Sequence, residues 1–231
     1  MALAPKPALP NAFLRPAELA ARRPGALETG LPGLDRLLGG GFPEGRVSEL
    51  AGVRGGRTAI ALHAAARLTS AGRLVALVDG SGALDPRSAA GLGVDLRRLL
   101  WVQLPPARLA GACDALLRGG AFALVIFDLV AIPPRRAPDA SAWVRLARAA
   151  EASRASLVVL GAEGWRGPGF CASASLALHR ARAGFVGRGP GRLLQSFSAE
   201  VELAHNKLGL PPATVKLEWR APDPFPPSAD R

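Results

Sequence analysis

The sequence has few of the residues that covalent or metal-based frameworks need. Its 231 residues include only two cysteines and three histidines. Cys113 and Cys171 fit neither a disulfide framework nor the spacing of a metal site. No run of 18 apolar residues is free of charge, so we expect no helix that spans a membrane. The first residues also lack the uninterrupted apolar stretch of a secretory signal. We therefore expect a cytoplasmic protein without a resident metal.

Signatures of covalent catalysis are missing as well. Ser48, Ser70 and Ser81 form no recognisable nucleophile–base pattern with the histidines His63, His179 and His205. This argues against a hydrolase triad. Hydrophobic residues make up 49% of the chain and charged residues 20%. Such a composition excludes a chain that is disordered throughout.

Positive charge is in excess. The 29 lysines and arginines outnumber the 18 acidic residues, giving a formal net charge of +11. A high net charge alone is a modest argument for nucleic-acid binding. Its location is more informative, because residues 164–199 hold no acid and five arginines, Arg166, Arg180, Arg182, Arg188 and Arg192.

Hydrophobic patterning predicts the fold class. Apolar runs of about five residues alternate with helical stretches as far as residue 160, which indicates a parallel sheet covered on both faces. After residue 170 the pattern changes to partial alternation, which is typical of antiparallel strands with one wet face. We expect an α/β core, a mainly parallel central sheet flanked by helices, with C-terminal antiparallel strands. Strands are predicted at 47–50, 74–78, 99–104, 123–127, 156–160, 176–183, 197–204 and 214–219, and helices at 58–68, 86–92, 107–117 and 140–152. We expect a flexible arm at 1–25, one domain at 26–220 and a disordered tail at 221–231.

A glycine-rich turn joins the first predicted strand to the first predicted helix. Such a turn can cradle a phosphate with backbone N–H groups and the helix N-terminus. The full phosphate-loop motif is G-x-x-x-x-G-K-[ST]. Here Ala51 stands at the first glycine and Arg57 at the lysine, and counting from Gly52 instead leaves the loop one residue short. Two interpretations remain open, a vestigial phosphate site or a turn that binds nothing. The candidate residues are Gly52, Gly55, Gly56, Arg57, Thr58 and, after a later strand, Asp128.

The segments around this loop resemble the RecA-type recombinase core. Residues 29–35, Thr-Gly-Leu-Pro-Gly-Leu-Asp, and residues 37–47 resemble its beginning, and residues 78–86 and 92–100 resemble the stretch after its second core strand. Residues 124–128, Leu-Val-Ile-Phe-Asp, look like its Walker B strand. Residues 205–207, His-Asn-Lys, resemble the Lys-Asn-Lys motif that reaches a neighbouring subunit's nucleotide. The resemblance covers about residues 26–219 in order and implies a RecA-like domain.

The same resemblance exposes departures from an ATPase. The acid that activates water in RecA corresponds to Ser81, and a serine is a poor general base. The glutamine that senses nucleotide falls near Glu163, and the loop lysine is Arg57. Asp128 persists, but without the lysine a magnesium nucleotide would be poorly held. We therefore expect no enzymatic activity, no catalytic residues and no cofactor, with ATP and Mg²⁺ doubtful.

Small RecA-like proteins of this kind resemble the ImuA family of bacterial mutagenesis cassettes. That resemblance implies a non-catalytic accessory role in the SOS response to DNA damage, in translesion DNA synthesis. The implied partners are DNA, RecA, an ImuB-like polymerase-family protein and an error-prone DNA polymerase. Two alternatives remain open. One is a small DNA-dependent ATPase that uses Arg57, Thr58 and Asp128. The other is a protein-binding inhibitor similar to SulA.

Basic residues provide candidate contacts to single-stranded DNA. Residues 165–175 lie where RecA has its second DNA loop, and Trp165 beside Arg166 could stack on bases. We expect Arg180 and Arg182 to share a strand face with Leu176 and Leu178, leaving both arginines free for phosphates. Arg135 and Arg136 fall near RecA's first DNA loop. The resemblance assigns His205 and Lys207 to a protein interface. Each set is also compatible with an ordinary solvated surface.

Overall fold

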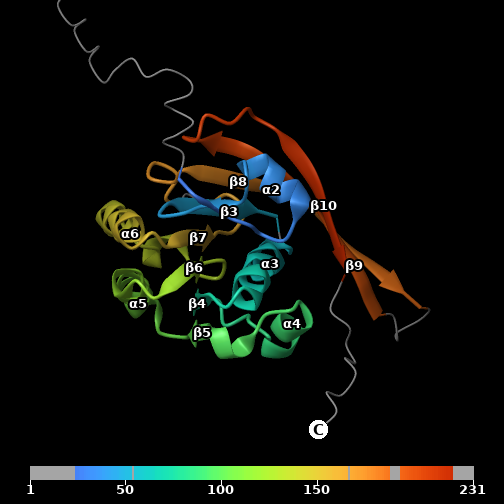
Figure 1. The fold of residues 1–231 in the computed structure, drawn as a ribbon, viewed down its shortest axis with the longest axis horizontal. Helices are drawn as coiled ribbons and strands as arrows, with labels where there is room; N and C mark the ends of the chain where they lie inside the picture. Colours follow the sequence, from blue (N-terminus) through green and yellow to red (C-terminus); the bar gives the residue numbers. More distant parts are fainter. Residues whose placement is uncertain (1–23, 54, 166, 188–192, 221–231) are drawn as a thin grey trace, which may run out of the picture.

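One eight-stranded sheet organises the chain. The computed structural model describes residues 24–53, 55–165, 167–187 and 193–220, so the predicted tail and all but Pro24 and Gly25 of the predicted arm lie outside it. The strand order is β10-β9-β8-β3-β7-β6-β4-β5. The strands β8, β3, β7, β6, β4 and β5, in this spatial order, run parallel to one another. Strand β9 pairs antiparallel with β8, and β10 pairs antiparallel with β9 (Figure 1). This confirms the predicted fold class. The strands are β3 (Val47–Gly52), β4 (Leu74–Asp79), β5 (Leu99–Val102), β6 (Phe122–Asp128), β7 (Ser156–Leu160), β8 (Ala174–Val186), β9 (Leu193–Asn206) and β10 (Thr214–Arg220).

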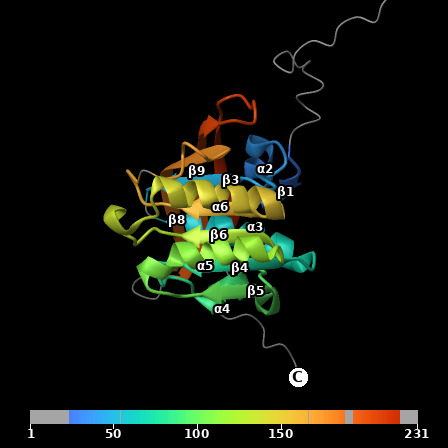
Figure 2. The same cartoon turned by 90° about the vertical axis from the view of Figure 1, so that its left-hand side faces the viewer.

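Helices cover both faces of the sheet. On one face α3 packs together with α2 and α4, and on the other face α5 lies beside α6, turned toward the viewer in Figure 2. Alternate residues of β6 supply the two cores: Leu124 and Ile126 pack on the α3 side, and Val125 and Phe127 on the α5–α6 side. This is why the central strands are continuously apolar. The helices are α2 (Pro32–Leu38), α3 (Arg57–Ser70), α4 (Pro86–Gly91), α5 (Pro106–Gly119) and α6 (Ala140–Ser153).

Three short elements near the start of the domain were not predicted. They are α2 and the two-stranded sheet of β1 (Ala26–Leu27) and β2 (Phe42–Pro43). Each is too short to show a hydrophobic period. Polar contacts hold this region, because the Asp35 carboxylate accepts hydrogen bonds from the backbone N–H and the hydroxyl of Thr29, at 2.8 and 2.7 Å. Helix α2 ends where Gly39 adopts a left-handed conformation with φ of 70°.

The expected face of β8 is wrong beyond Leu178. The pairing register with β9 shifts between Leu178 and Arg180, leaving His179 as an extra residue. A bulge of this kind moves the following side chains to the opposite face. Leu176 and Leu178 therefore face the core, whereas Arg180 and Arg182 lie on the other face with Ser198 and Lys216.

The connection from β7 to β8 contains no helix. Strand β3 lies between these two strands and is parallel to both, so residues 161–173 must return along the sheet to the amino end of β8. They do so on the α5–α6 side, where Trp165 packs edge-on against Trp143 at a centroid distance of 6.1 Å. We call residues 161–165 and 167–173 the cover segment. Within the described residues no helix is long and apolar enough to cross a bilayer.

Candidate functional site

The candidate phosphate loop and Asp128 meet at the carboxyl edge of the sheet. A hollow of about 270 Å³ is lined by Gly55, Gly56, Thr58, Ser81 and Asp128, with Arg57 on its wall. The crevice at the carboxyl ends of strands is where open α/β sheets bind ligands. Five of the six residues that the sequence grouped as a phosphate site therefore line one hollow, and Gly52 does not. What they do to one another decides its chemistry.

The loop itself is fixed by its packing against β8. Gly52 has a φ of 132°, and a Cβ there would come 2.2 Å from the carbonyl oxygen of Leu178. The N–H of Val53 donates to that same oxygen at 3.0 Å. Gly55 and Gly56 lie beneath the ring of Phe197, with φ of 89° and 84°. Glycine is required at these positions by close packing and backbone conformation, whether or not the loop binds phosphate.

Arg57 turns back into the protein. It is the first residue of α3, and side chains there lean toward the preceding loop. Its guanidinium donates to the carbonyl oxygens of Gly52 and of Gly161, the latter at 2.9 Å, and the residue is only 5% exposed. Burial lowers the pKa of Arg57, and the negative charges of Asp128 and Glu163 offset part of that effect. The cation therefore joins two loops of its own chain.

Asp79, at the end of β4, is the centre of a dense set of hydrogen bonds. Its Oδ1 accepts from the N–H groups of residues 81–83 and from the Ser81 hydroxyl, with the shortest bond, 2.7 Å, from Gly82. Its Oδ2 accepts from the N–H of Leu84 and the indole of Trp101, at 3.2 and 3.1 Å. Burial acts to raise the pKa of Asp79, but these bonds outweigh it and hold the pKa below its ordinary value.

Ser81 bridges Asp79 to Asp128. Its hydroxyl lies 3.1 Å from Asp79 Oδ1 and 3.0 Å from Asp128 Oδ2. Burial raises the pKa of Asp128, with the charge of Asp79 adding to this, while Val130 N–H, Ser81 and Arg57 oppose it. A hydroxyl carries one proton, so it can donate to only one carboxylate at a time. Ser81 therefore lies between two carboxylates and leaves one of them without its proton at any time.

An apolar hollow adjoins this site. It measures about 290 Å³ and shares Thr58 and Ala83 with the first hollow. Phe197 and Trp219 line it and stack on each other with centroids 5.2 Å apart. The antiparallel strands thus place two aromatic rings over the turn that precedes α3.

The predicted DNA contacts are not gathered in one place. Arg135 and Arg136 are exposed on a 3-10 turn (Pro134–Arg136) that follows β6, near the hollow. Trp165 is half-buried, with a Cβ at Gly161 or Gly167 falling 2.0 or 2.2 Å from its ring. It packs on the sheet instead of standing free for a base. Arg166 lies outside the described residues.

Arg180 and the adjacent His179 have acidic neighbours that the sequence did not reveal. Residues 164–199 contain no acid, but β9 runs beside β8 and places Glu200 opposite Arg180 and Glu202 next to His179. Arg180 and Glu200 lie 3.9 Å apart, and His179 Nε2 contacts Glu202 Oε2. The basic stretch is therefore partly neutralised in space.

His205 and Lys207 lie at the other end of the sheet. His205 pairs with Ser175 near the start of β8, and both His205 and Lys207 are exposed. The ammonium of Lys207 donates to the carbonyl oxygen of Phe170 at 2.6 Å. The candidate interface residues are thus separated from the phosphate loop by the length of a strand, and one of them contacts the cover segment.

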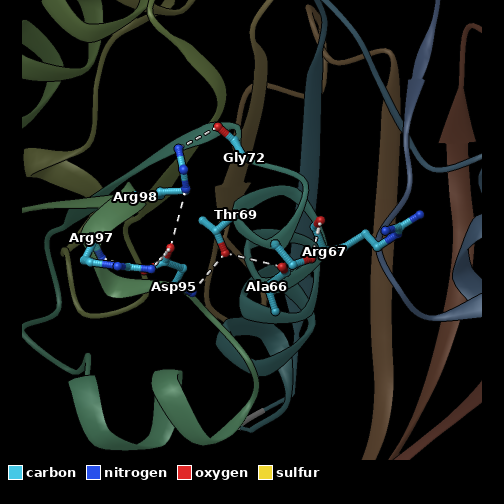
Figure 3. A network of polar contacts seen from close by, with 8 residues as sticks. Ala66, Arg67, Thr69, Gly72, Asp95, Arg97 and Arg98 are labelled. Carbon is cyan, nitrogen blue, oxygen red and sulfur yellow. Dashed lines mark hydrogen bonds and ion pairs between the residues drawn. The ribbon is translucent and has the colours of Figure 1, made fainter.

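A second pair of adjacent arginines connects two elements of the fold. Arg97 and Arg98 precede β5 on a 3-10 turn (Leu96–Arg98) and both contact Asp95, at 3.0 and 3.5 Å. The N–H of Asp95 in turn donates to the Thr69 hydroxyl at 3.1 Å, and Arg98 donates to Gly72 O (Figure 3). This network joins the end of α3 to β5.

Three further residues were missed by sequence reasoning. Asp79 and Trp101 belong to the set of hydrogen bonds described above. The sequence signal for Asp79 was its place at the end of a predicted strand, directly before the residues Gly-Ser-Gly. Glu49, within β3, is 8% exposed and accepts hydrogen bonds from the Ser175 hydroxyl at 3.3 Å and the Gly167 N–H. Its burial raises its pKa. A charged residue inside an apolar strand was the signal there.

Comparison with known proteins agrees with this geometry. The family described as RecA N-terminal domain matches residues 17–141. Relatives named protein RecA from Picosynechococcus, Nostoc and Prochlorococcus marinus are 38%, 40% and 40% identical over 123, 123 and 128 residues. These matches cover 52–54% of this chain and 34–35% of each relative. The chain thus spans about a third of the length of the curated relatives it matches.

The site does not fit a magnesium nucleotide. Phosphoryl transfer requires a cation that reaches the β- and γ-phosphates and an acid that holds the metal. The Arg57 guanidinium is already bound to the carbonyls of Gly52 and Gly161. Asp128 already accepts a hydrogen bond from the N–H of Val130 at 2.9 Å, and it shares the Ser81 hydroxyl with Asp79. Both groups would have to break buried contacts before they could hold a nucleotide.

The Asp79 hydrogen bonds predict a pH-dependent stability. Asp79→Asn keeps one acceptor oxygen and places an amide against N–H donors, so we expect a loss of about 2 kcal/mol or more at neutral pH. Because the folded pKa is lowered, this stabilisation is present above the ordinary aspartate pKa and is lost as pH falls through the lowered value. The difference between wild type and variant should therefore shrink in acid. Urea denaturation across the acidic range measures it.

The exposed helix cap Asp85 supplies the matched control. Asp85 accepts from the N–H groups of Arg87 and Ser88 at the start of α4. Asp85→Asn should cost much less than Asp79→Asn, since asparagine is also a good N-cap. Equal losses in the two variants would show that the buried set of bonds has no special weight.

Proposed function

Because the chain belongs to the family of the RecA N-terminal domain, we propose that it is a non-catalytic, RecA-like accessory protein of mutagenic DNA repair. In this role it binds DNA and modulates RecA alongside an error-prone polymerase complex with an ImuB-like partner. The resemblance to ImuA supports the finer assignment to translesion synthesis. The observation that carries the proposal is Ser81, which joins two carboxylates at the position of the water-activating acid.

Hydrolysis of ATP requires that a protein group activates the attacking water. A general base must accept a proton from that water, and its efficiency depends on a pKa near the working pH. Serine cannot do this, and its hydroxyl already contacts Asp79 and Asp128. Asp128 is 2% exposed, and its carboxylate accepts a hydrogen bond from the N–H of Val130. A RecA-like domain built in this way favours binding over turnover.

DNA binding should depend on exposed arginines that form no ion pair with the described residues, such as Arg135 and Arg136. Arg135 and Arg136 are exposed at the carboxyl edge, whereas Arg180 faces Glu200. Arg135→Glu with Arg136→Glu should weaken binding to single-stranded DNA more than Arg180→Glu with Arg182→Glu. The slope of log affinity against log salt should fall by roughly 0.7 for each phosphate that the variant no longer binds. Fluorescence anisotropy with a labelled oligonucleotide over a salt series measures both quantities.

The chain offers a matched control for that experiment. Arg97 and Arg98 are also adjacent arginines on a 3-10 turn, but they contact Asp95 at the opposite end of the sheet. Arg97→Glu with Arg98→Glu changes the net charge equally and should leave most of the affinity intact. Equal losses in both double variants would mean that binding follows net charge alone and has no preferred site.

RecA-dependent strand exchange tests the proposed role most widely. A filament grows only if each subunit offers two complementary faces. This chain retains exposed His205 and Lys207 at one end, while the loop at the other end is closed by Arg57. Added in increasing amounts, it should therefore end filament growth and inhibit strand exchange. His205→Ala and Lys207→Ala should each relieve that inhibition.

Two outcomes would count against this role. Inhibition that is unchanged in both variants would exclude His205 and Lys207 from the interface. No inhibition at all, at a salt concentration where the protein does not coat DNA, would contradict modulation of RecA.

A further inference from the structure

The backbone of the cover segment is held by charged side chains from three different elements. Arg57 of α3 donates to Gly161 O at 2.9 Å. Glu49 of β3 accepts from the N–H of Gly167. Lys207, just after β9, donates to Phe170 O at 2.6 Å. The beginning, middle and end of the segment are thus each tied to the sheet by a charge.

The first tie is reinforced from the other side. The N–H of Gly161 donates to Leu50 O at 3.0 Å, so both polar groups of this peptide position are bonded to the elements that flank the phosphate loop. Because Arg57 also binds Gly52 O, one guanidinium connects the loop to the start of the cover segment. Hydrogen bonds from a charged donor to buried carbonyls are among the stronger ones.

The second tie lies beneath the segment. A Cβ at Gly167 would come 2.3 Å from Glu49 Oε1 and 2.2 Å from the ring of Trp165, so the backbone lies directly on both groups. Glu49 is 8% exposed and also bonds Ser175, the second residue of β8. A buried carboxylate that lost these donors would be left without compensation. The Glu49 carboxylate therefore stabilises the conformation in which the cover segment lies on β3.

We propose that Arg57 and Glu49 are positioning residues that hold the cover segment against β3 in one conformation without any nucleotide. The segment, including Phe170, which is 56% exposed, then keeps the same conformation with and without nucleotide. The inference rests on the proposed non-catalytic function, but it concerns loop order and is tested separately from RecA inhibition.

Hydrogen exchange of the full chain, read by mass spectrometry, tests the proposal. In wild type, the hydrogen-bonded amides of Cys171, Ala172 and Ser173 should be protected to the same extent with and without Mg²⁺-ATP. In Arg57→Met, which keeps the length of the side chain and removes its donors, their exchange should be about tenfold faster or more. Exchange in β6 should stay unchanged, which separates local release from general loss of stability. Arg57→Lys, which keeps the charge, should restore part of the protection.

Arg97→Met is the matched control, because the side chain of Arg97 is 89% exposed beside the edge strand β5, several strands away from the cover segment. It should leave the cover segment at the wild-type rate. If Arg57→Met does not fold, Lys207→Met tests the third tie and should release residues 170–173 only. Protection in wild type that appears only with Mg²⁺-ATP would overturn the proposal. So would wild-type exchange in Arg57→Met, or acceleration that is equal in β6 and in the cover segment.

Discussion

The buried guanidinium of Arg57 is the interaction on which the carboxyl edge of this sheet depends. A buried guanidinium needs hydrogen-bond acceptors, and here one of its nitrogens, Nη1, donates to the carbonyl oxygens of Gly52 and Gly161. The same contacts close the phosphate loop and fix the start of the cover segment. A lysine at this position would present a compact ammonium that a phosphate could share, whereas Nη1 of Arg57 already donates to two carbonyl oxygens of its own chain. Arg57 thus acts as a structural contact between the loop and the cover segment.

A second centre, Asp79, complements the first. It gathers the N–H groups of residues 81–84 and the indole of Trp101 from the neighbouring edge strand. Through Ser81 it connects to Asp128, whose charge lies near Arg57. The ends of β4 and β6 and the start of α3 are therefore parts of one polar network. Such networks rigidify a site when all members are satisfied, which fits a domain that acts by binding.

Much of the fold was predictable because the core strands and helices are long and strongly patterned. The runs in β6 and β7 and the buried face of α6 at Trp143, Leu146 and Ala150 appear where the sequence indicated. The bulge at His179 was not predictable, since alternation in one strand carries no information about its partner. Glu200 became a neighbour of Arg180 only through strand pairing. The residues that line the hollow beside Asp128 could be predicted from sequence motifs. The inward direction of the Arg57 side chain could not, because it depends on contacts with residues distant in the sequence.

The central claim is that this RecA-like site performs no phosphoryl transfer. The most direct measurement is phosphate release from Mg²⁺-ATP, with and without single-stranded DNA, in wild type and in Thr58→Ala. Thr58 lines the hollow at the start of α3, so any genuine turnover should depend on it. The account predicts the same background rate in all four conditions. Turnover that DNA stimulates and that Thr58→Ala abolishes would contradict it.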